Sequence, residues 1–336
     1  MSNPIYHLAE FFPGMGTLAA PFCEGLSLNG DVVFGGAAEL DGRYLELFSH
    51  QHPGASTYLG SVSHYAPEEL LTASPTGAIR ILVGGIPCTG SSAAGKSKRH
   101  LTAAEMHPDV GALFIPFLHQ VTLSLPDLVV CENVPPYATS FSAQMIRNHL
   151  ERLGYLITEK VVNPYTDFET ATERKRWIMV ASRMGCFHWN YTPRAFTGTI
   201  EHLLDPVSDA DAADEFTAEQ VAAHTKYLAR KAAEGCGFAR RILERTSIKV
   251  PTICKTYGKI QPSSSFLSSG ETYRMLRPRE IARIHGFGPK FIEVIDQLPK
   301  TTAYEVLGQG VVAAPFRSLG SAIGEWVASI NLKSAA

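Results

Sequence analysis

Long apolar runs are absent from this sequence of 336 residues. The longest, such as 81–86 and 112–118, fall far short of the roughly 20 residues that a membrane-spanning helix needs. The chain also has little net charge, with 30 Lys and Arg against 32 Asp and Glu. We therefore expect no membrane anchor, and no nucleic-acid binding that depends on net charge alone.

Cysteine is scarce, and no two cysteines form a CxxC pair. This argues against a zinc knuckle, a redox pair or a disulfide scaffold, and we expect no bound metal. Each cysteine has to be judged singly, and the ordinary interpretation of each is a small buried hydrophobe. The six are Cys23, Cys88, Cys131, Cys186, Cys236 and Cys254.

The composition is that of a globular protein, with 45% hydrophobic, 18% charged and 10% aromatic residues. The first residues, MSNPIYHLAEFF, lack the basic start and long apolar core of a signal peptide, so we expect a cytoplasmic protein. The length suggests two domains or one domain with a large insertion.

The first half alternates short apolar runs with amphipathic stretches, which predicts βα units and a mostly parallel sheet covered on both faces. Helices are expected between the strands and at the end of the chain, where apolar residues recur three or four apart. The predicted strands are 6–12, 32–39, 79–84, 127–131, 155–162 and 177–181, and the predicted helices are 17–28, 42–50, 110–123, 140–153 and 315–331.

The regular alternation stops near Ser182, which indicates a second, smaller domain. We place the large domain at 1–183, completed by 303–336, and the small domain at 184–302. Within the small domain, the segment 226–259 has nine basic and two acidic residues, a net charge of +7. A solvated helix face is the alternative interpretation of this charge. The segment PSSSFLSSG, at 262–270, predicts an adaptable loop.

Two glycines, Gly14 and Gly16, follow the first predicted strand and permit a tight turn that a nucleoside ligand can approach closely. Glu39 ends the second predicted strand, where a carboxylate can accept both hydroxyls of a ribose. Ala19 occupies the third position of GxGxxG and no Walker lysine follows, which disfavours NAD and ATP. The pattern indicates an adenosine-containing cofactor, with a structural turn and a surface acid as the alternative.

A cysteine and a carboxyl group are expected at the carboxyl edge of the sheet, where α/β proteins bind ligands. Cys88 follows the strand ILVGGIP, and Glu132 and Asn133 end the next strand. Arg174 and Arg176 precede the last predicted strand. A thiolate can add to an electron-poor ring while an acid protonates a ring nitrogen and a cation stabilises developing charge.

Seven segments resemble, in the same order, the motifs of DNA cytosine-5-methyltransferases, and together they span nearly the whole chain except the middle of the small domain. The segments are FFPGMGTLAAPFCEGL, AELD, GGIPCTGSSAAG, PDLVVCENVPPY, TERKRWIMVAS, RMLRPREIARIHGFGP and VLGQGVVAAPF. The resemblance implies an α/β, Rossmann-like S-adenosylmethionine-dependent methyltransferase fold with a smaller target-recognition domain.

The resemblance further implies transfer of a methyl group from S-adenosylmethionine to carbon 5 of a cytosine flipped out of duplex DNA. Cys88 would add to carbon 6, because carbon 5 is a poor nucleophile until the aromatic system is interrupted. Glu132 would hold the ring at nitrogen 3 and supply or share a proton. Arg174 would contact the carbonyl oxygen of the base, Arg176 its surroundings or Glu132, and Asn133 would fix the loop.

Further residues would line the cofactor pocket: Phe12, Gly14, Met15, Gly16, Glu39, Leu40, Ser61, Val62, Gln309, Gly310 and Val311. The segment 89–107 resembles the mobile loop that closes over DNA in this family, and its basic residues suit phosphate contacts. A solvated charge run is the alternative. The expected DNA-binding residues are Ser91, Ser92, Lys96, Lys98 and Arg99.

Six positions depart from the family pattern without removing the core chemistry. Ser61 stands in place of an aspartate that accepts from the adenine amino group, which bears on cofactor affinity and identity. The other departures are Thr89, Thr172 and His285 in place of glutamines, Ser91 in place of a phenylalanine, and Gln309 in place of an asparagine.

Two alternatives remain open. One is a tRNA cytosine-5-methyltransferase, although the Cys-Phe-Thr segment common in that branch is absent here. The other is a non-catalytic DNA-binding paralogue, against which the intact Cys88, Glu132 and Arg174 argue. Duplex DNA is the expected partner and a cognate restriction endonuclease a candidate one. Restriction-modification, orphan regulatory and phage self-protection roles fit equally well.

Overall fold

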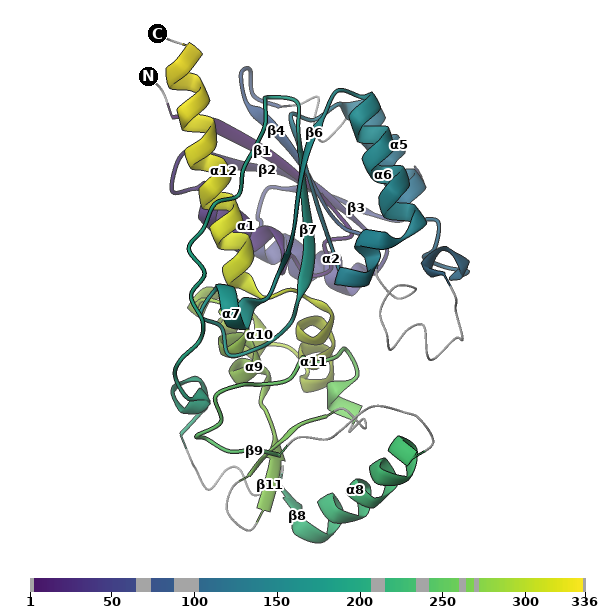
Figure 1. Cartoon of the computed structure of the whole chain (residues 1–336), viewed down its shortest axis with the longest axis vertical. Helices are drawn as coiled ribbons and strands as arrows, with labels where there is room; N and C mark the ends of the chain where they lie inside the picture. The colour runs from purple at the N-terminus through teal and green to yellow at the C-terminus, as the bar shows by residue number, and fades with distance from the viewer. Residues whose placement is uncertain are drawn as a thin grey trace. The chain divides into compact units, whose positions relative to one another are not determined.

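The chain was analysed as a computed structural model that describes residues 3–64, 74–87, 103–206, 215–233, 242–259, 264–268 and 272–334. It divides into two compact units, each of which is built from several stretches of sequence (Figure 1). The first unit comprises Met1–Val162, Lys175–Thr192 and Pro315–Ala336, and the second comprises Asn163–Arg174 and Pro193–Ala314. The domain boundaries expected from the sequence, at 183/184 and 302/303, stay a prediction.

Seven strands among the described residues form the sheet of the first unit, in the order β3-β2-β1-β4-β5-β7-β6. Neighbours among the first five are parallel, whereas β7 runs antiparallel to both β5 and β6. The bounds are β1 Ile5–Phe11, β2 Asp31–Glu39, β3 Ser56–Leu59, β4 Ile79–Gly85, β5 Leu128–Asn133, β6 Leu156–Val162 and β7 Arg176–Ser182. The mostly parallel α/β sheet is therefore confirmed. β3 was not predicted, because its four mostly exposed residues show no apolar alternation.

Helices α5 (Phe114–Ser124) and α6 (Phe141–Arg152) pack on one face of this sheet (Figure 1). Their buried side chains join those of the strands in a single apolar cluster, which supplies most of the driving force for folding this face. Gly84, near the end of β4, lies under this layer, and a Cβ there would come within 2.5 Å of the Phe117 ring. A glycine is therefore required for the close approach of β4 to α5.

Helices α1 (Ala19–Leu26) and α12 (Ala313–Ser334) pack against each other in the same unit (Figure 1). A Cβ at Gly25 would lie 2.1 Å from the carbonyl oxygen of Arg317, and one at Gly320 would lie 2.2 Å from that of Phe22. No side chain fits in either place, so the two glycines set the helix separation. Helix α2 (Gly42–Gln51) follows β2, and its N-cap Asp41 accepts the backbone N–H of Arg43.

The second unit contains a four-stranded sheet among its described residues, in the order β8-β11-β10-β9. Its strands are short, which explains why the sequence showed no clear strand period there. The bounds are β8 Glu215–Thr217, β9 Ile242–Leu243, β10 Phe266–Ser268 and β11 Thr272–Met275, with helices α7 Pro164–Asp167, α8 Ala218–Ala233, α9 Pro278–Ile284, α10 Pro289–Asp296 and α11 Lys300–Gln309.

The expectation of an adaptable loop at 262–270 is wrong for its described part, 264–268. Phe266 and Leu267 are buried in β10, which pairs with β11 on one side and β9 on the other. The Phe266 ring also packs edge-on against that of Phe216, with centroids 5.2 Å apart. Two apolar residues in a serine-rich segment were enough to form a buried strand, because both sides of it are hydrogen-bonded.

Candidate active site

The ends of β5 and β7 bring together an acid and an arginine. Glu132 is paired with Ile178 across the antiparallel β5–β7 ladder, so Arg176 is its diagonal neighbour on the same face. The Nε atom of Arg176 lies 2.5 Å from Oε1 of Glu132, and the two side chains are only 11% and 12% exposed. Arg176 thus lies against Glu132, as one of the two sequence-based options had it. Because β7 is antiparallel, its first residue lies where β5 ends.

Asn133 connects this pair to the strand that leads toward Cys88. Its side-chain amide donates a hydrogen bond of 3.0 Å to the carbonyl oxygen of Ile86, and its Oδ1 accepts the backbone N–H of Val134 at 2.9 Å. Asn133 is 1% exposed, so water does not compete for these bonds. The amide therefore holds the end of β4 to the end of β5, two residues before Cys88 in the sequence.

Several predicted residues lie outside the described part of the chain: Cys88, Thr89, Ser91, Ser92, Lys96, Lys98 and Arg99. Their expected roles in nucleophilic attack and DNA contact stay predictions. The last residues of the segment 89–107 are among those that the structure describes. There the Glu105 carboxylate accepts hydrogen bonds from the backbone N–H and the hydroxyl of Ser142, both at 2.6 Å. An acid at the N-terminus of α6 also interacts favourably with the helix dipole.

The glycine turn after β1 lies beside the end of β2. Gly14 and Gly16 have positive φ values of 56° and 86°, which residues other than glycine rarely adopt. The Glu39 carboxylate accepts the backbone N–H of Gly14 at 2.9 Å through one oxygen. The other oxygen accepts those of Leu40 at 2.7 Å and Asp41 at 3.1 Å. A carboxylate has about four acceptor positions, so room remains beside these three bonds for a ligand hydroxyl. The expected contact with both ribose hydroxyls stays a prediction.

Other predicted cofactor residues of the first unit differ in accessibility. Leu40 is 74% exposed directly after Glu39, whereas Met15 and Val62 are buried in the core. Ser61 accepts the backbone N–H of Ser63 at 3.2 Å, and its hydroxyl starts a short 3-10 turn. Phe12 has a positive φ of 61° and packs against the core cluster.

A buried acid at this edge was missed by the sequence analysis. Glu10 lies in β1 and is 1% exposed. Burial, and then repulsion by the Glu39 carboxylate, raises the pKa of Glu10 well above its usual value. Its Oε2 is buried and has no hydrogen-bond partner among the residues that the structure describes. The detectable signal was an acidic residue inside the apolar strand YHLAEFF, directly before a glycine turn.

The sequence analysis also missed a hydrogen-bond network around Glu159. It contacts β7 on the face of the sheet opposite to Glu132 and Arg176. The buried indole of Trp177 donates to Glu159 Oε2 at 3.0 Å, and Glu159 is also paired with Arg147. Arg147 in turn donates 2.6 Å to the carbonyl oxygen of Ala138, in the turn that follows β5. These bonds hold the first residues of β7 and the turn after β5 in fixed places.

The remaining predicted residues belong to the second unit. Arg174 is 4% exposed and donates to the carbonyl oxygens of Ile253 at 2.8 Å and Gly308 at 3.0 Å. Gln309 ends α11, Gly310 is its C-cap, and Val311 is buried. The structure therefore divides the predicted constellation: Glu132 and Arg176 meet in the first unit, whereas Arg174 and the 309–311 turn belong to the second.

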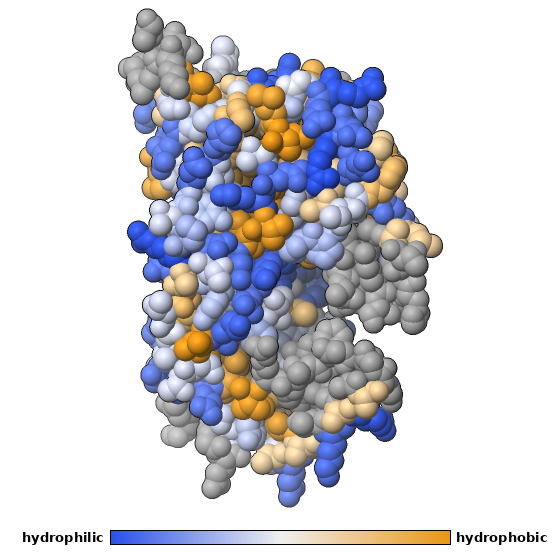
Figure 2. Space-filling model, viewed as in Figure 1, coloured by the Kyte–Doolittle hydropathy of each residue, from blue (hydrophilic) through white to orange (hydrophobic). Residues whose placement is uncertain are grey.

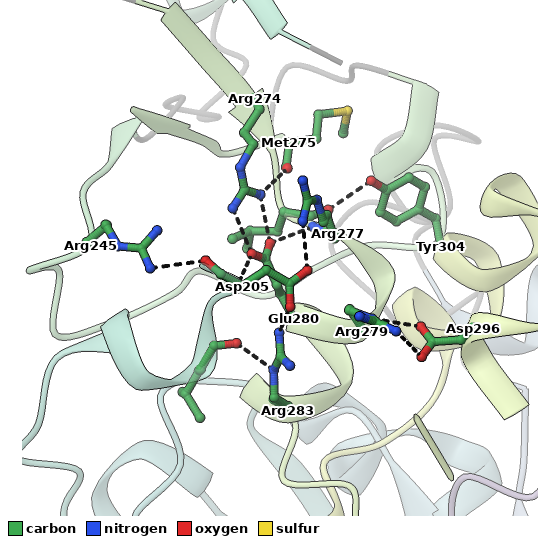
Figure 3. Close-up of polar contacts among 12 residues, drawn as sticks. Asp205, Arg245, Arg274, Met275, Arg277, Arg279, Glu280, Arg283, Asp296 and Tyr304 are labelled. Carbon is green, nitrogen blue, oxygen red and sulfur yellow. Dashed lines mark hydrogen bonds and ion pairs between the residues drawn. The ribbon is translucent and has the colours of Figure 1, made fainter. Parts of the chain in front are cut away.

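Buried ion pairs organise the second unit around the completely buried Glu280 (Figure 3). Arg274 donates two hydrogen bonds to this carboxylate, of 2.8 and 2.7 Å, and the backbone N–H groups of Asp205 and Arg277 donate two more. A buried ion pair is tolerated only when its charges are satisfied in this way. The contacts of Glu280 therefore give it a structural role in the second unit.

Asp205 adds two more arginines to this network. Arg277 donates to its carboxylate at 3.0 Å and Arg283 does so through the other oxygen (Figure 3). Burial raises the pKa of Asp205, but the hydrogen bonds from Arg283 and Arg277 outweigh it and lower the pKa below its usual value. Arg279 pairs instead with Asp296 of α10. Together with the Arg274–Glu280 pair, these contacts connect the chain at Asp205 with β11, α9 and α10.

Within the described residues, no group of three or more His, Cys, Asp or Glu side chains could hold a metal ion. None of the helices described above has both the length and the apolar character required to cross a membrane.

The sheet with its antiparallel β7, the glycine turn beside Glu39 and the Glu132–Arg176 pair together define a Rossmann-like methyltransferase fold. A family model of the C-5 cytosine-specific DNA methylases matches residues 6–325, and the chain belongs to this family. It is an S-adenosylmethionine-dependent DNA cytosine-5-methyltransferase.

Similar curated proteins are type II methyltransferases. The M.DsaV enzyme of Dactylococcopsis salina is 22% identical over 317 residues, which is 92% of this chain and 83% of that protein. The M.SsoII enzyme of Shigella sonnei is 24% identical over 253 residues, 72% of this chain and 63% of that protein.

Two solved structures share the fold. The Entamoeba histolytica methyltransferase EhMeth superposes with a TM-score of 0.74 at 19% identity, and the alignment covers 97% of this chain and 99% of that one. The Dnmt2 methyltransferase of S. pombe superposes with a TM-score of 0.71 at 14% identity over 97% and 99%. At such identities the likeness concerns the fold alone.

Proposed function

We propose that the end of β5 is the reaction centre of this DNA cytosine-5-methyltransferase, with Cys88 as nucleophile and Glu132 as proton donor. The observation that carries the proposal is the buried Glu132–Arg176 pair, joined through Asn133 to the strand that ends just before Cys88. The family membership supplies the reaction, and the geometry of these strand ends supports the assignment of roles.

The Cys88 thiolate would add to carbon 6 of a cytosine extruded from the duplex, which breaks the aromatic system and makes carbon 5 nucleophilic. Glu132 would then protonate or hydrogen-bond nitrogen 3, so that the charge from the addition is neutralised. Arg176 would keep the Glu132 carboxyl oriented toward the ring. After methyl transfer, loss of the carbon 5 proton and departure of the thiolate would restore the aromatic ring. Flipping the base costs a few kcal/mol, which DNA contacts offset.

The residues at the ends of β1 and β2 fit an adenosine-containing sulfonium cofactor. S-adenosylmethionine supplies the methyl group when bound. The positive-φ glycines let the backbone approach a ligand, and Glu39 retains room for one ribose hydroxyl. The exposed Leu40 offers an apolar surface for a purine. The buried oxygen of Glu10, which lacks a partner among the described residues, provides a place for a ligand donor. The cofactor-binding roles expected of Gln309, Gly310 and Val311 stay predictions.

Methyl-group labelling tests the reaction and its substrate together. The purified protein is incubated with methyl-labelled S-adenosylmethionine and either unmodified plasmid DNA or total tRNA, and the products are digested to nucleosides. We expect label in 5-methyldeoxycytidine. Label confined to tRNA would overturn the DNA assignment, and an undiminished rate in Cys88→Ala would overturn the mechanism. Cys186→Ala, which removes an exposed thiol, is the matched control and should transfer methyl groups at the wild-type rate.

A cognate restriction endonuclease is the biological partner that the type II relatives support. If the enzyme protects DNA, plasmid methylated by it should resist one endonuclease whose site contains the labelled cytosine. Mapping the labelled positions by bisulfite sequencing gives that site. Methylation without any fixed sequence context would contradict a role in restriction-modification.

A further inference from the structure

Helix α8 directly follows β8, so its first turn adjoins the four-stranded sheet of the second unit. Thr217 and Gln220 cap the helix reciprocally, since each backbone N–H is accepted by the other side chain, at 2.8 and 3.3 Å. Among the α8 side chains that the structure describes, only Val221 is buried, at 7% exposure. The helix follows β8 and extends away from the small sheet (Figure 1), and its other described side chains are exposed.

The side of α8 opposite Val221 is basic. At about 100° per residue, Lys226 lies about 140° and Arg230 about 180° around the helix from Val221. The two cations are four residues apart, so they are neighbours along one face. Between them Tyr227 is 42% exposed, and the Arg230 guanidinium lies 5.5 Å from its ring centroid. This contact restricts the guanidinium to the exposed face. Figure 2 shows hydrophilic side chains projecting from this part of the molecule.

Three cations of the basic segment 226–259 that lie outside α8 are paired with acids. Arg245 lies 3.5 Å from Glu201, Lys249 lies 3.1 Å from Glu173 and Lys255 lies 2.8 Å from Glu305. These three cations are neutralised within the second unit and stabilise it. The side chains of Lys226 and Arg230 are exposed on α8, and that of Lys259 is exposed outside it.

One acid, Glu219, lies on the same face of α8 as the two cations, at the N-terminal end of the helix. Glu219 lies in the first turn, about 160° from Val221, where a negative charge stabilises the helix N-terminus. Lys226 is about 10 Å further along the axis. The acidic and basic ends of the face are thus separate.

We propose that Lys226, Tyr227 and Arg230 of α8 bind the phosphate backbone of the duplex DNA substrate. Two cations one helical turn apart suit successive phosphates, and a tyrosine hydroxyl can donate to a phosphate oxygen. Contacts of this kind fix the position of the protein on DNA and carry no base information. The α8 face therefore contributes to affinity for any duplex, and neither to site choice nor to the methyl-transfer step. The proposal rests on the proposed function only in taking duplex DNA as the substrate.

Salt-dependent binding of the full-length protein tests this role. The probes are a fluorescein-labelled random-sequence duplex of about 30 base pairs and, in a separate arm, labelled total tRNA, with anisotropy measured between 50 and 200 mM salt. Each lost phosphate contact should lower the slope of log K against log salt by about 0.9. Lys226→Ala and Arg230→Ala should each bind duplex more weakly than wild type. The difference from wild type should shrink by about three- to fourfold across this salt range.

Two control variants test whether the charge of the α8 face sets the affinity for duplex DNA. Lys290→Ala removes an exposed cation from α10 in the same unit and should leave both Kd and slope unchanged. Glu219→Gln removes the acid from the α8 face and should tighten duplex binding. Far-UV circular dichroism of every variant shows whether the helix content is kept. At saturating DNA the α8 variants should keep the wild-type kcat and show a raised KM for DNA.

Equal Kd values and slopes for the wild type and the Lys226→Ala/Arg230→Ala double variant would overturn the proposal. So would a loss confined to tRNA binding, which would assign the face to RNA. Because anisotropy needs no turnover, the result stands whether or not methyl transfer is observed. A failure of the proposed function would appear separately, as absent label in the wild-type enzyme.

Discussion

The side-chain amide of Asn133, at the end of β5, holds the carbonyl oxygen of Ile86, just beyond β4, at 3.0 Å. This bond fixes the chain two residues before the proposed nucleophile. It also lies next to Glu132, so the same short segment positions both the nucleophile strand and the acid. Changes at this point should therefore affect chemistry more than ligand binding.

Asn133→Ala should lower kcat for methyl transfer by about tenfold to a hundredfold, because small displacements of a reacting group are costly. Loss of both buried hydrogen bonds should also reduce the free energy of unfolding by about 1–3 kcal/mol. Single-turnover methyl transfer and chemical denaturation measure the two effects. Asn190→Ala, at an exposed position, serves as control. A wild-type rate in Asn133→Ala would show that Ile86 needs no such anchor.

Glu132→Gln should reduce the rate by about 10²–10⁴-fold, the usual contribution of a general acid. The amide keeps the size of the side chain, so affinity for duplex DNA should remain within about twofold of wild type, and the loss should appear in kcat rather than KM. Arg176→Gln leaves Glu132 buried without its partner and should also lower stability, by about 1–3 kcal/mol. Arg194→Ala, whose side chain is 72% exposed, is the control. Full activity in Glu132→Gln would remove the acid from the mechanism.

Glu39→Ala should weaken S-adenosylmethionine binding by about tenfold or more, because it removes both the ligand acceptor and the bond to the Gly14 N–H. Isothermal titration calorimetry without DNA measures this directly. Glu46→Ala, which removes an exposed acid from α2, should bind the cofactor as wild type does. Equal affinities in the two variants would place the ribose elsewhere.

The buried Glu10 predicts an unusual pH dependence. Its pKa is raised in the folded state, so above its unfolded pKa of about 4.3 the unfolded chain releases a proton that the native state retains. Stability is therefore lost as pH rises, by about 1.4 kcal/mol per unit until the folded pKa is reached. Glu10→Gln should gain stability relative to wild type as pH rises above about 4, and the two should converge at lower pH. Parallel Tm curves for the two proteins would show that Glu10 titrates normally.

Glu280→Gln should cost about 3–5 kcal/mol, because Arg274 would be left as an uncompensated buried charge. Replacing the exposed Asp296, which pairs with Arg279 at the surface, should cost less than about 1 kcal/mol. Urea denaturation compares the two. A similar small cost for both would mean that water reaches Arg274 in the second unit.

Residue patterns alone predicted six of the seven strands and the main helices of the first unit. The apolar runs before Gly14, Cys88 and Asn133 are long enough to specify buried strands, and the residue types that follow them indicate their chemistry. The motif order then led to the family. These features are local, or depend on order along the chain, so they can be read without coordinates.

The tertiary structure decided the direction of the strands, the burial of individual side chains and which residues lie together. The antiparallel insertion of β7 places Arg176 against Glu132, and strand direction is a property of the sheet rather than of the strand. Phe266 joined a sheet because partners on both sides saturate its backbone, which serine-rich flanks conceal. Glu10 is perturbed because helices and strands exclude water around it. Pairing, burial and desolvation each depend on segments distant in sequence, and packing alone brings these together.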